Sequence, residues 1–157
     1  MCTLAASKGM DDAAANSGES VVMGRTILGI LAGLVVAWLT ISVCEFASLF
    51  LHRPPVGMDL RDPQALAAHI AAAPASAMLV VVAGWALAAL FGGWVAARIA
   101  RHQRVAALVI GVLVVLGVIA NSMVIPHPSW MTIAGIALPV PTAWLAARLA
   151  RSKPMPT

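Results

Sequence analysis

Charged side chains are scarce in this 157-residue sequence, since Asp, Glu, Lys and Arg together make up only 10% of it. In soluble globular domains the share is about a quarter. Hydrophobic residues make up 61% of the chain, and its mean hydropathy is +0.94. This composition excludes an ordinary soluble domain and predicts an integral membrane protein whose main partner is the lipid bilayer.

Cysteine is almost absent, and motifs for chemistry are missing. Cys2 belongs to a polar segment and Cys44 to a long apolar run, so the sequence has neither a disulfide framework nor a CxxC motif. It also lacks the spacing of a metal-binding HExxH helix, a phosphate loop and a signal peptide. We therefore expect no enzymatic activity, no cofactor and no bound metal.

The formal net charge is +4 and the isoelectric point about 10.1. The basic residues flank apolar runs instead of forming a patch with interleaved aromatics, which argues against a nucleic-acid partner. The positive-inside rule predicts both termini in the cytoplasm, and the composition indicates a bacterial inner membrane. The basic residues of the predicted inner segments are Lys8, Arg25, Arg98, Arg101, Arg104, Arg148, Arg151 and Lys153.

Four apolar runs, at about 22–51, 74–100, 105–125 and 129–150, are each long enough to cross the membrane. A helix of about 20 residues crosses roughly 30 Å of hydrocarbon. The runs lack the alternation of barrel strands, and open strands leave backbone groups unsatisfied in lipid. The predicted fold is an all-α bundle of four transmembrane helices. Residues 1–21 and 152–157 are expected to be cytoplasmic tails, the first disordered, with Met23 as an alternative start.

The first outer loop, residues 52–73, is predicted to carry a short surface helix. His52 to Gly57 includes two prolines, which favour extended or turning chain. Asp62 followed by Pro63 has the form of an N-cap and a first helical residue. The helix is expected to run to about residue 73.

An eight-residue repeat closes two of the spans: WVAARIAR at 94–101 returns as WLAARLAR at 144–151. Trp at headgroup level and Arg reaching an anionic surface anchor a helix end to the cytoplasmic face of a membrane. With a weaker parallel between the first and third spans, the repeat suggests two duplicated hairpins. The predicted anchors are Trp94, Arg98, Arg101, Trp144, Arg148 and Arg151.

Small residues recur every fourth position in the second span, and a GxxxG pattern lies in the first. Such stripes let helices approach closely. The stripe either packs within the chain or forms the seam of a homodimer. Pro139 and Pro141 predict a kink in the fourth span. The predicted packing residues are Gly29, Gly33, Gly84, Ala88, Gly92 and Ala96.

Glu45 is the only carboxylate inside a predicted span. At about 1.5 Å per residue it lies roughly 30 Å from Arg25, which places it near the outer interface. It is either a helix-end group or part of a site for protons or a ligand. The candidate outer-face polar cluster is Glu45, His52, Asn121 and His127.

We therefore expect a non-catalytic accessory or structural membrane protein. The alternative is a small solute or proton-linked transporter that uses Glu45 and Asn121. A membrane enzyme with its site at the outer mouth, built from Glu45, His52 and His127, is a third hypothesis.

Several strings resemble a group of small bacterial four-span integral membrane proteins. The resemblance covers most of the chain beyond the N-terminal tail and implies the same four-span fold, without implying an activity. The residues that carry it are Glu45, the run His52-Arg53-Pro54-Pro55-Val56-Gly57-Met58-Asp59, Asp62, Pro74, Gly92-Gly93, Asn121 and the run Pro126-His127-Pro128-Ser129-Trp130.

Overall fold

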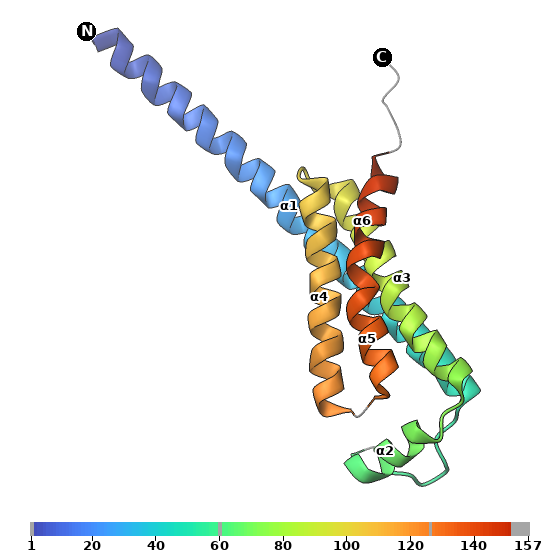
Figure 1. The fold of residues 1–157 in the computed structure, drawn as a ribbon. Coiled ribbons are helices and arrows are strands. Elements are labelled where there is room, and N and C mark those ends of the chain that lie inside the picture. Colours follow the sequence, from blue (N-terminus) through green and yellow to red (C-terminus); the bar gives the residue numbers. More distant parts are fainter. Residues whose placement is uncertain (1, 60, 126, 152–157) are drawn as a thin grey trace.

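The computed structural model describes residues 2–59, 61–125 and 127–151, with their side chains from Val22 onward. Within these ranges the regular structure is entirely helical, as predicted. Four segments are long and apolar enough to cross a membrane: Val22–Leu51, Ala75–Ile99, Gln103–Val124 and Ser129–Ala150. The protein is a multi-pass membrane protein built as a four-helix bundle (Figure 1). The helices are α1 Cys2–Leu51, α2 Pro63–Ala71, α3 Ala75–Ile99, α4 Gln103–Val124, α5 Ser129–Ala137 and α6 Pro139–Ala150.

Helix α1 is longer than predicted. It begins at Cys2, whereas the sequence predicted a disordered tail over residues 1–21. The segment is rich in alanine, and the first proline of the chain is Pro54. Because alanine has the best helix propensity and the segment has no proline, the apolar span extends backward as helix in spite of Gly9 and Gly18. The apolar part itself, Val22–Leu51, agrees with the prediction.

The surface helix α2 forms where the sequence predicted it. The Asp62 carboxylate accepts a hydrogen bond from the Gln64 backbone N–H at 2.9 Å, and Pro63 is the first helical residue. This is the expected N-cap arrangement. Helix α2 lies at the end of the bundle opposite to the start of the apolar part of α1 and to the end of α6 (Figure 1).

The fourth span is broken at Leu138 into α5 and α6, which confirms the predicted kink. Pro139 and Pro141 have no N–H, so two carbonyls one turn earlier lose their helical donors. The Thr142 hydroxyl lies 3.0 Å from the carbonyl oxygens of Leu138 and Pro139 and donates a hydrogen bond there. It thereby stabilises the backbone directly after the break.

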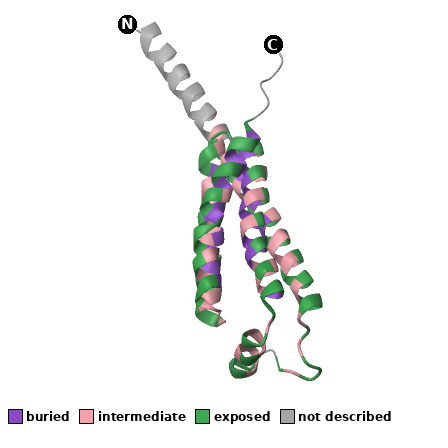
Figure 2. Cartoon of the chain, turned by 45° about the vertical axis from the view of Figure 1, so that its right-hand side comes forward, coloured by how far each residue is buried: buried purple, intermediate pink, exposed green. Residues whose placement is uncertain are grey.

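Helix α3 is the centre of the bundle. It packs against α1 on one side and against α4 and α6 on the other, whereas α1 makes only limited contact with α4. Its buried side chains are mostly alanine and glycine, and burial follows the facing sides of the helices (Figure 2). Small residues bring the helix axes close together, which is the main source of association in lipid.

Glycines mark the closest approach of α1 to α3. A Cβ atom placed on Gly92 would lie 2.5 Å from the Gly33 carbonyl oxygen, and one placed on Gly33 would lie 2.5 Å from that of Gly92. Farther along the same interface, a Cβ on Gly29 would meet the Ala96 carbonyl oxygen at 2.9 Å. One on Gly84 would meet the Cβ of Cys44 at 2.6 Å. At Gly33 and Gly92 the two backbones are too close for any side chain.

The opposite side of α3 is covered as well. A Cβ on Gly93 would contact Ala143 and Ala146 of α6. On the side that faces α1, Ala96 lies against Gly33, and both Ala88 and Ala96 have no exposed surface. The predicted packing stripe is therefore occupied within the chain. A homodimer would need a different surface from this stripe.

The α1–α3 crossing predicts a difference between two Gly→Ala variants. Gly92→Ala should destabilise the protein by about 1–3 kcal/mol, because the new methyl group forces two backbones apart. Gly117→Ala is the matched control, since nothing lies within 4 Å of the position its Cβ would take. Thermal unfolding in detergent measures the difference. Equal midpoints for both variants would contradict the proposed role of this contact.

The distribution of basic residues predicts the orientation. In a background without Cys2 and Cys44, an impermeant thiol reagent added to intact cells should label a cysteine at Val56 and leave one at Lys153 unlabelled. Val56 is fully exposed in the loop between α1 and α2. Labelling of both positions, or of Lys153 alone, would refute the cytoplasmic placement of the termini.

Candidate functional site

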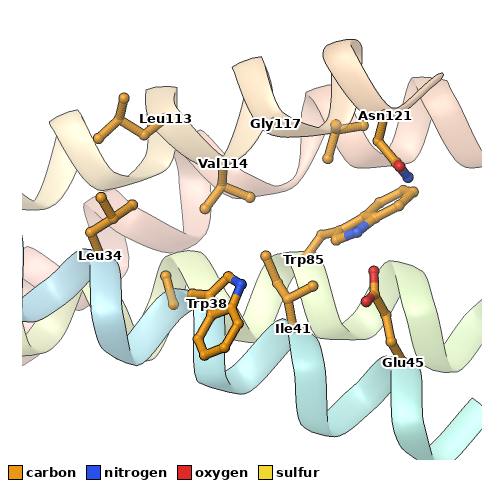
Figure 3. Close-up of a pocket in the computed structure, with 11 residues that line it drawn as sticks. Leu34, Trp38, Ile41, Glu45, Trp85, Leu113, Val114, Gly117 and Asn121 are labelled. Atoms are coloured by element: carbon orange, nitrogen blue, oxygen red, sulfur yellow. The ribbon is translucent and has the colours of Figure 1, made fainter. Parts of the chain in front are cut away.

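A cavity of about 200 Å³ lies between α1, α3 and α4, toward the end of the bundle that carries α2. Its walls are apolar except for Glu45 on α1 and Asn121 on α4, which point into the same space from opposite sides (Figure 3). The remaining lining residues are Leu34, Ala37, Trp38, Ile41, Trp85, Leu113, Val114, Gly117 and Val118.

Glu45 is an exposed carboxylate on a transmembrane helix. It lies six residues before the end of α1 at Leu51, which corresponds to about 9 Å along the axis. Among the side chains that the structure describes, none forms a hydrogen bond or an ion pair with it. An unpaired carboxylate at this depth is unfavourable in lipid. Where Glu45 faces hydrocarbon, it would need water, a proton or a cation as a partner.

Trp85 forms the inner wall between Glu45 and Asn121 (Figure 3). Only 3% of its surface is exposed, and its ring lies so close to Gly135 of α5 that a Cβ there would be 2.6 Å away. The glycine on α5 therefore makes room for the indole on α3. Trp38 provides a second indole at the exposed edge of the cavity. Two indoles beside a carboxylate favour a cationic group.

Three histidines line a second cavity of about 170 Å³ under α2. The rings of His52 and His69 stack, with centroids 4.1 Å apart, and the His52 Nε2–H donates to the His69 carbonyl oxygen at 3.0 Å. These contacts hold α2 against the end of α1. The His127 Nδ1–H donates to the Ile125 carbonyl oxygen at 2.7 Å.

The predicted outer-face cluster is thus divided between two cavities. Glu45 and Asn121 line the first, and His52 and His127 line the second. The two are neighbours, because the ring of His127, which lines the second cavity, meets that of Trp85, which lines the first, edge-on at 6.1 Å. In the described part of the chain, no three His, Cys, Asp or Glu side chains come close enough to hold a metal ion.

The acidic residues of the loop have local roles. The Asp59 carboxylate accepts a hydrogen bond from the Arg61 backbone N–H at 2.9 Å, and Asp62 caps α2. Neither residue lines either cavity.

Sequence reasoning missed the two tryptophans of the first cavity. Trp85 stands in an ordinary run of small and branched residues, and its role depends on a glycine fifty positions later. The sequence contains no local pattern that pairs Trp85 with Gly135, so the contact becomes visible only in the structure.

At the opposite end of the bundle, the repeated Trp and Arg residues form two similar pairs. The Arg98 guanidinium carbon lies 4.9 Å from the Trp94 ring centroid, and that of Arg148 lies 3.6 Å from the Trp144 centroid. Both distances are within the range of cation–π attraction.

Comparison of the chain with protein-family models, with curated proteins and with solved structures finds no match.

The histidine contact predicts a pH dependence. Burial and the neighbouring His52 lower the pKa of His69 from its ordinary value of 6.5. The unfolded chain therefore takes up a proton there before the folded protein does, so stability should fall as the pH drops below 6.5. Thermal unfolding between about pH 8 and about pH 5 should show this loss in the wild type and a smaller loss in His69→Gln.

His102→Gln is the control for that measurement, since His102 lies in the loop between α3 and α4 at the other end. It should retain the wild-type pH dependence. A His69→Gln protein with an unchanged pH dependence would show that His69 is not responsible.

Proposed function

We propose that this protein is a non-catalytic accessory protein of the bacterial inner membrane, with its termini in the cytoplasm, that binds a small solute between α1 and α4. One observation carries the proposal. The unpaired Glu45 carboxylate and the Asn121 amide point into one largely apolar cavity near the predicted outer face.

The surroundings of the potential nucleophiles support a non-catalytic role. The Ser48 hydroxyl lines the histidine cavity, but it donates its hydrogen bond to the Glu45 backbone carbonyl at 2.7 Å. The Cys44 side chain packs against Gly84 in the α1–α3 interface. A nucleophile requires a base within hydrogen-bond reach, and neither residue has one among the described side chains.

The shape of the cavity favours a small amphiphile with a cationic group. Its volume of about 200 Å³ is below the roughly 300–1,000 Å³ of sites for drug-sized ligands. Glu45 supplies the negative charge, Asn121 a hydrogen bond, and Trp85 and Trp38 aromatic faces. Because Trp38 is 65% exposed at the edge of α1, the ligand can enter sideways from the membrane.

Proton-linked transport is the second candidate, and the break in the fourth span favours it. Discontinuous helices accompany solute sites in many transporters, where one part of the bundle moves against another. Here α5 carries Gly135, which holds Trp85 against the cavity. A movement of α5 about Leu138 would therefore change the cavity wall.

Binding of benzyltrimethylammonium, a permanent cation with a small apolar body, tests the proposed site. Equilibrium dialysis of the purified protein in non-ionic detergent should show saturable binding. Glu45→Gln should weaken it about tenfold, as expected for the loss of one opposite charge. Neopentylbenzene is the uncharged analogue of the same shape. It should bind weakly, and its affinity should be the same for the wild type and for Glu45→Gln.

Asp59→Asn is the matched control, because it removes the same charge from the same end of the bundle outside both cavities. It should leave binding unchanged. Absence of saturable binding, or equal binding by Glu45→Gln, would refute the solute site. In proteoliposomes with a pH gradient, uptake of the cation that depends on Glu45 would establish transport in place of an accessory role.

A further inference from the structure

The two copies of the Trp-Arg repeat converge at one point. In each copy the first arginine stacks on its own tryptophan, as described above. The second arginine of each copy, Arg101 after α3 and Arg151 after α6, lines a single hollow of about 270 Å³. Arg104, in the first turn of α4, lines it too. Three arginines from three helix ends therefore line one space.

The positive charge of this hollow is not balanced within the described part of the chain. The carboxylates among the described side chains are Glu45, Asp59 and Asp62, which belong to the opposite end. Arg101, Arg104 and Arg151 have no described ion-pair partner. Three like charges around one space repel each other, so an anion there would be strongly favoured.

The start of α4 adds to the positive potential of the hollow. Its first turn contains no acidic residue, and the N-cap residue His102 makes no side-chain hydrogen bond to it. The first helical hydrogen bond is donated by the Ala106 N–H to the His102 carbonyl. The backbone N–H groups before Ala106, including those of Gln103 and Val105 in the wall of the hollow, are therefore free for an external acceptor.

We propose that this hollow binds the phosphate group of an anionic phospholipid. Guanidinium groups bind phosphate oxygens through paired hydrogen bonds, and a helix N-terminus adds donors and a favourable dipole. Trp94 and Trp144 belong to the same helix ends and are typical of the headgroup level. A lipid phosphate is already concentrated at this depth, whereas a free phosphate ion must come from bulk water. Basic hollows between transmembrane helices suit anionic headgroups.

Native mass spectrometry of the purified full chain in neutral detergent tests the proposal. Phosphatidylglycerol should bind with a ratio of one per chain and more tightly than phosphatidylcholine. The double variant Arg101→Gln/Arg151→Gln should weaken phosphatidylglycerol binding about tenfold or more, since two charge-assisted contacts are lost. Arg101→Lys/Arg151→Lys keeps the charge but loses the planar fork of the guanidinium group. Its affinity for phosphatidylglycerol should therefore lie between that of the wild type and that of the glutamine variant.

Arg101→Gln alone should also weaken binding, and its matched control is Arg25→Gln, which removes one positive charge from the same end of the bundle outside the hollow. The control should bind phosphatidylglycerol nearly as the wild type does. Equal loss in the two single glutamine variants would mean that net charge alone attracts the lipid and would overturn the proposal. Displacement of the lipid by millimolar inorganic phosphate would show a site for the free anion and would overturn the lipid as ligand. Unchanged unfolding midpoints in all variants confirm that folding is not the cause.

Discussion

The close contact between α1 and α3 at Gly33 and Gly92 is the constraint on which the rest of the structure depends. In lipid, apolar side chains gain little by leaving one neighbour for another, so helices associate where their backbones can approach. This contact ties α1 to α3, and Ile110 of α4 fills the space beside it. Toward the α2 end, α4 contributes Gly117, whose Cβ position has no neighbour within 4 Å. The cavity opens there because α1 stays packed against α3 and makes only limited contact with α4.

The same constraint explains where the large side chains are. A core of alanine and glycine has no room for aromatics, so most tryptophans lie at the bundle surface or at helix ends. Trp85 is the exception, and Gly135 on α5 accommodates it. Because this glycine precedes the break at Leu138, the prolines of the fourth span also set the position of the cavity wall. The position of the polar site therefore depends on packing between residues that have no polar or reactive side-chain groups at the site.

The features that the sequence predicted are those that depend on local patterns. The four spans follow from hydropathy, the start of α2 from Asp62 and Pro63, and the kink from Pro139 and Pro141. The segment before Val22 was predicted wrongly, since polar composition was given more weight than its helix-forming alanines. Sequence reasoning also grouped His52 with Glu45 by spacing, whereas the structure assigns them to different cavities. That division depends on how α2 folds back, which no local pattern encodes.

The two ends of the bundle are opposite in charge, and this bears on how the protein lies in the membrane. One end gathers guanidinium groups around the start of α4, and the other holds the carboxylates of Glu45, Asp59 and Asp62 together with Arg53 and Arg61. A chain inserted in reverse would move the arginines around the start of α4 across the membrane, which the positive-inside rule opposes. The predicted anchors would therefore affect the cavity only by fixing the orientation of the whole protein in the membrane. By this rule, the predicted anchor arginines would also determine which side of the membrane Glu45 faces.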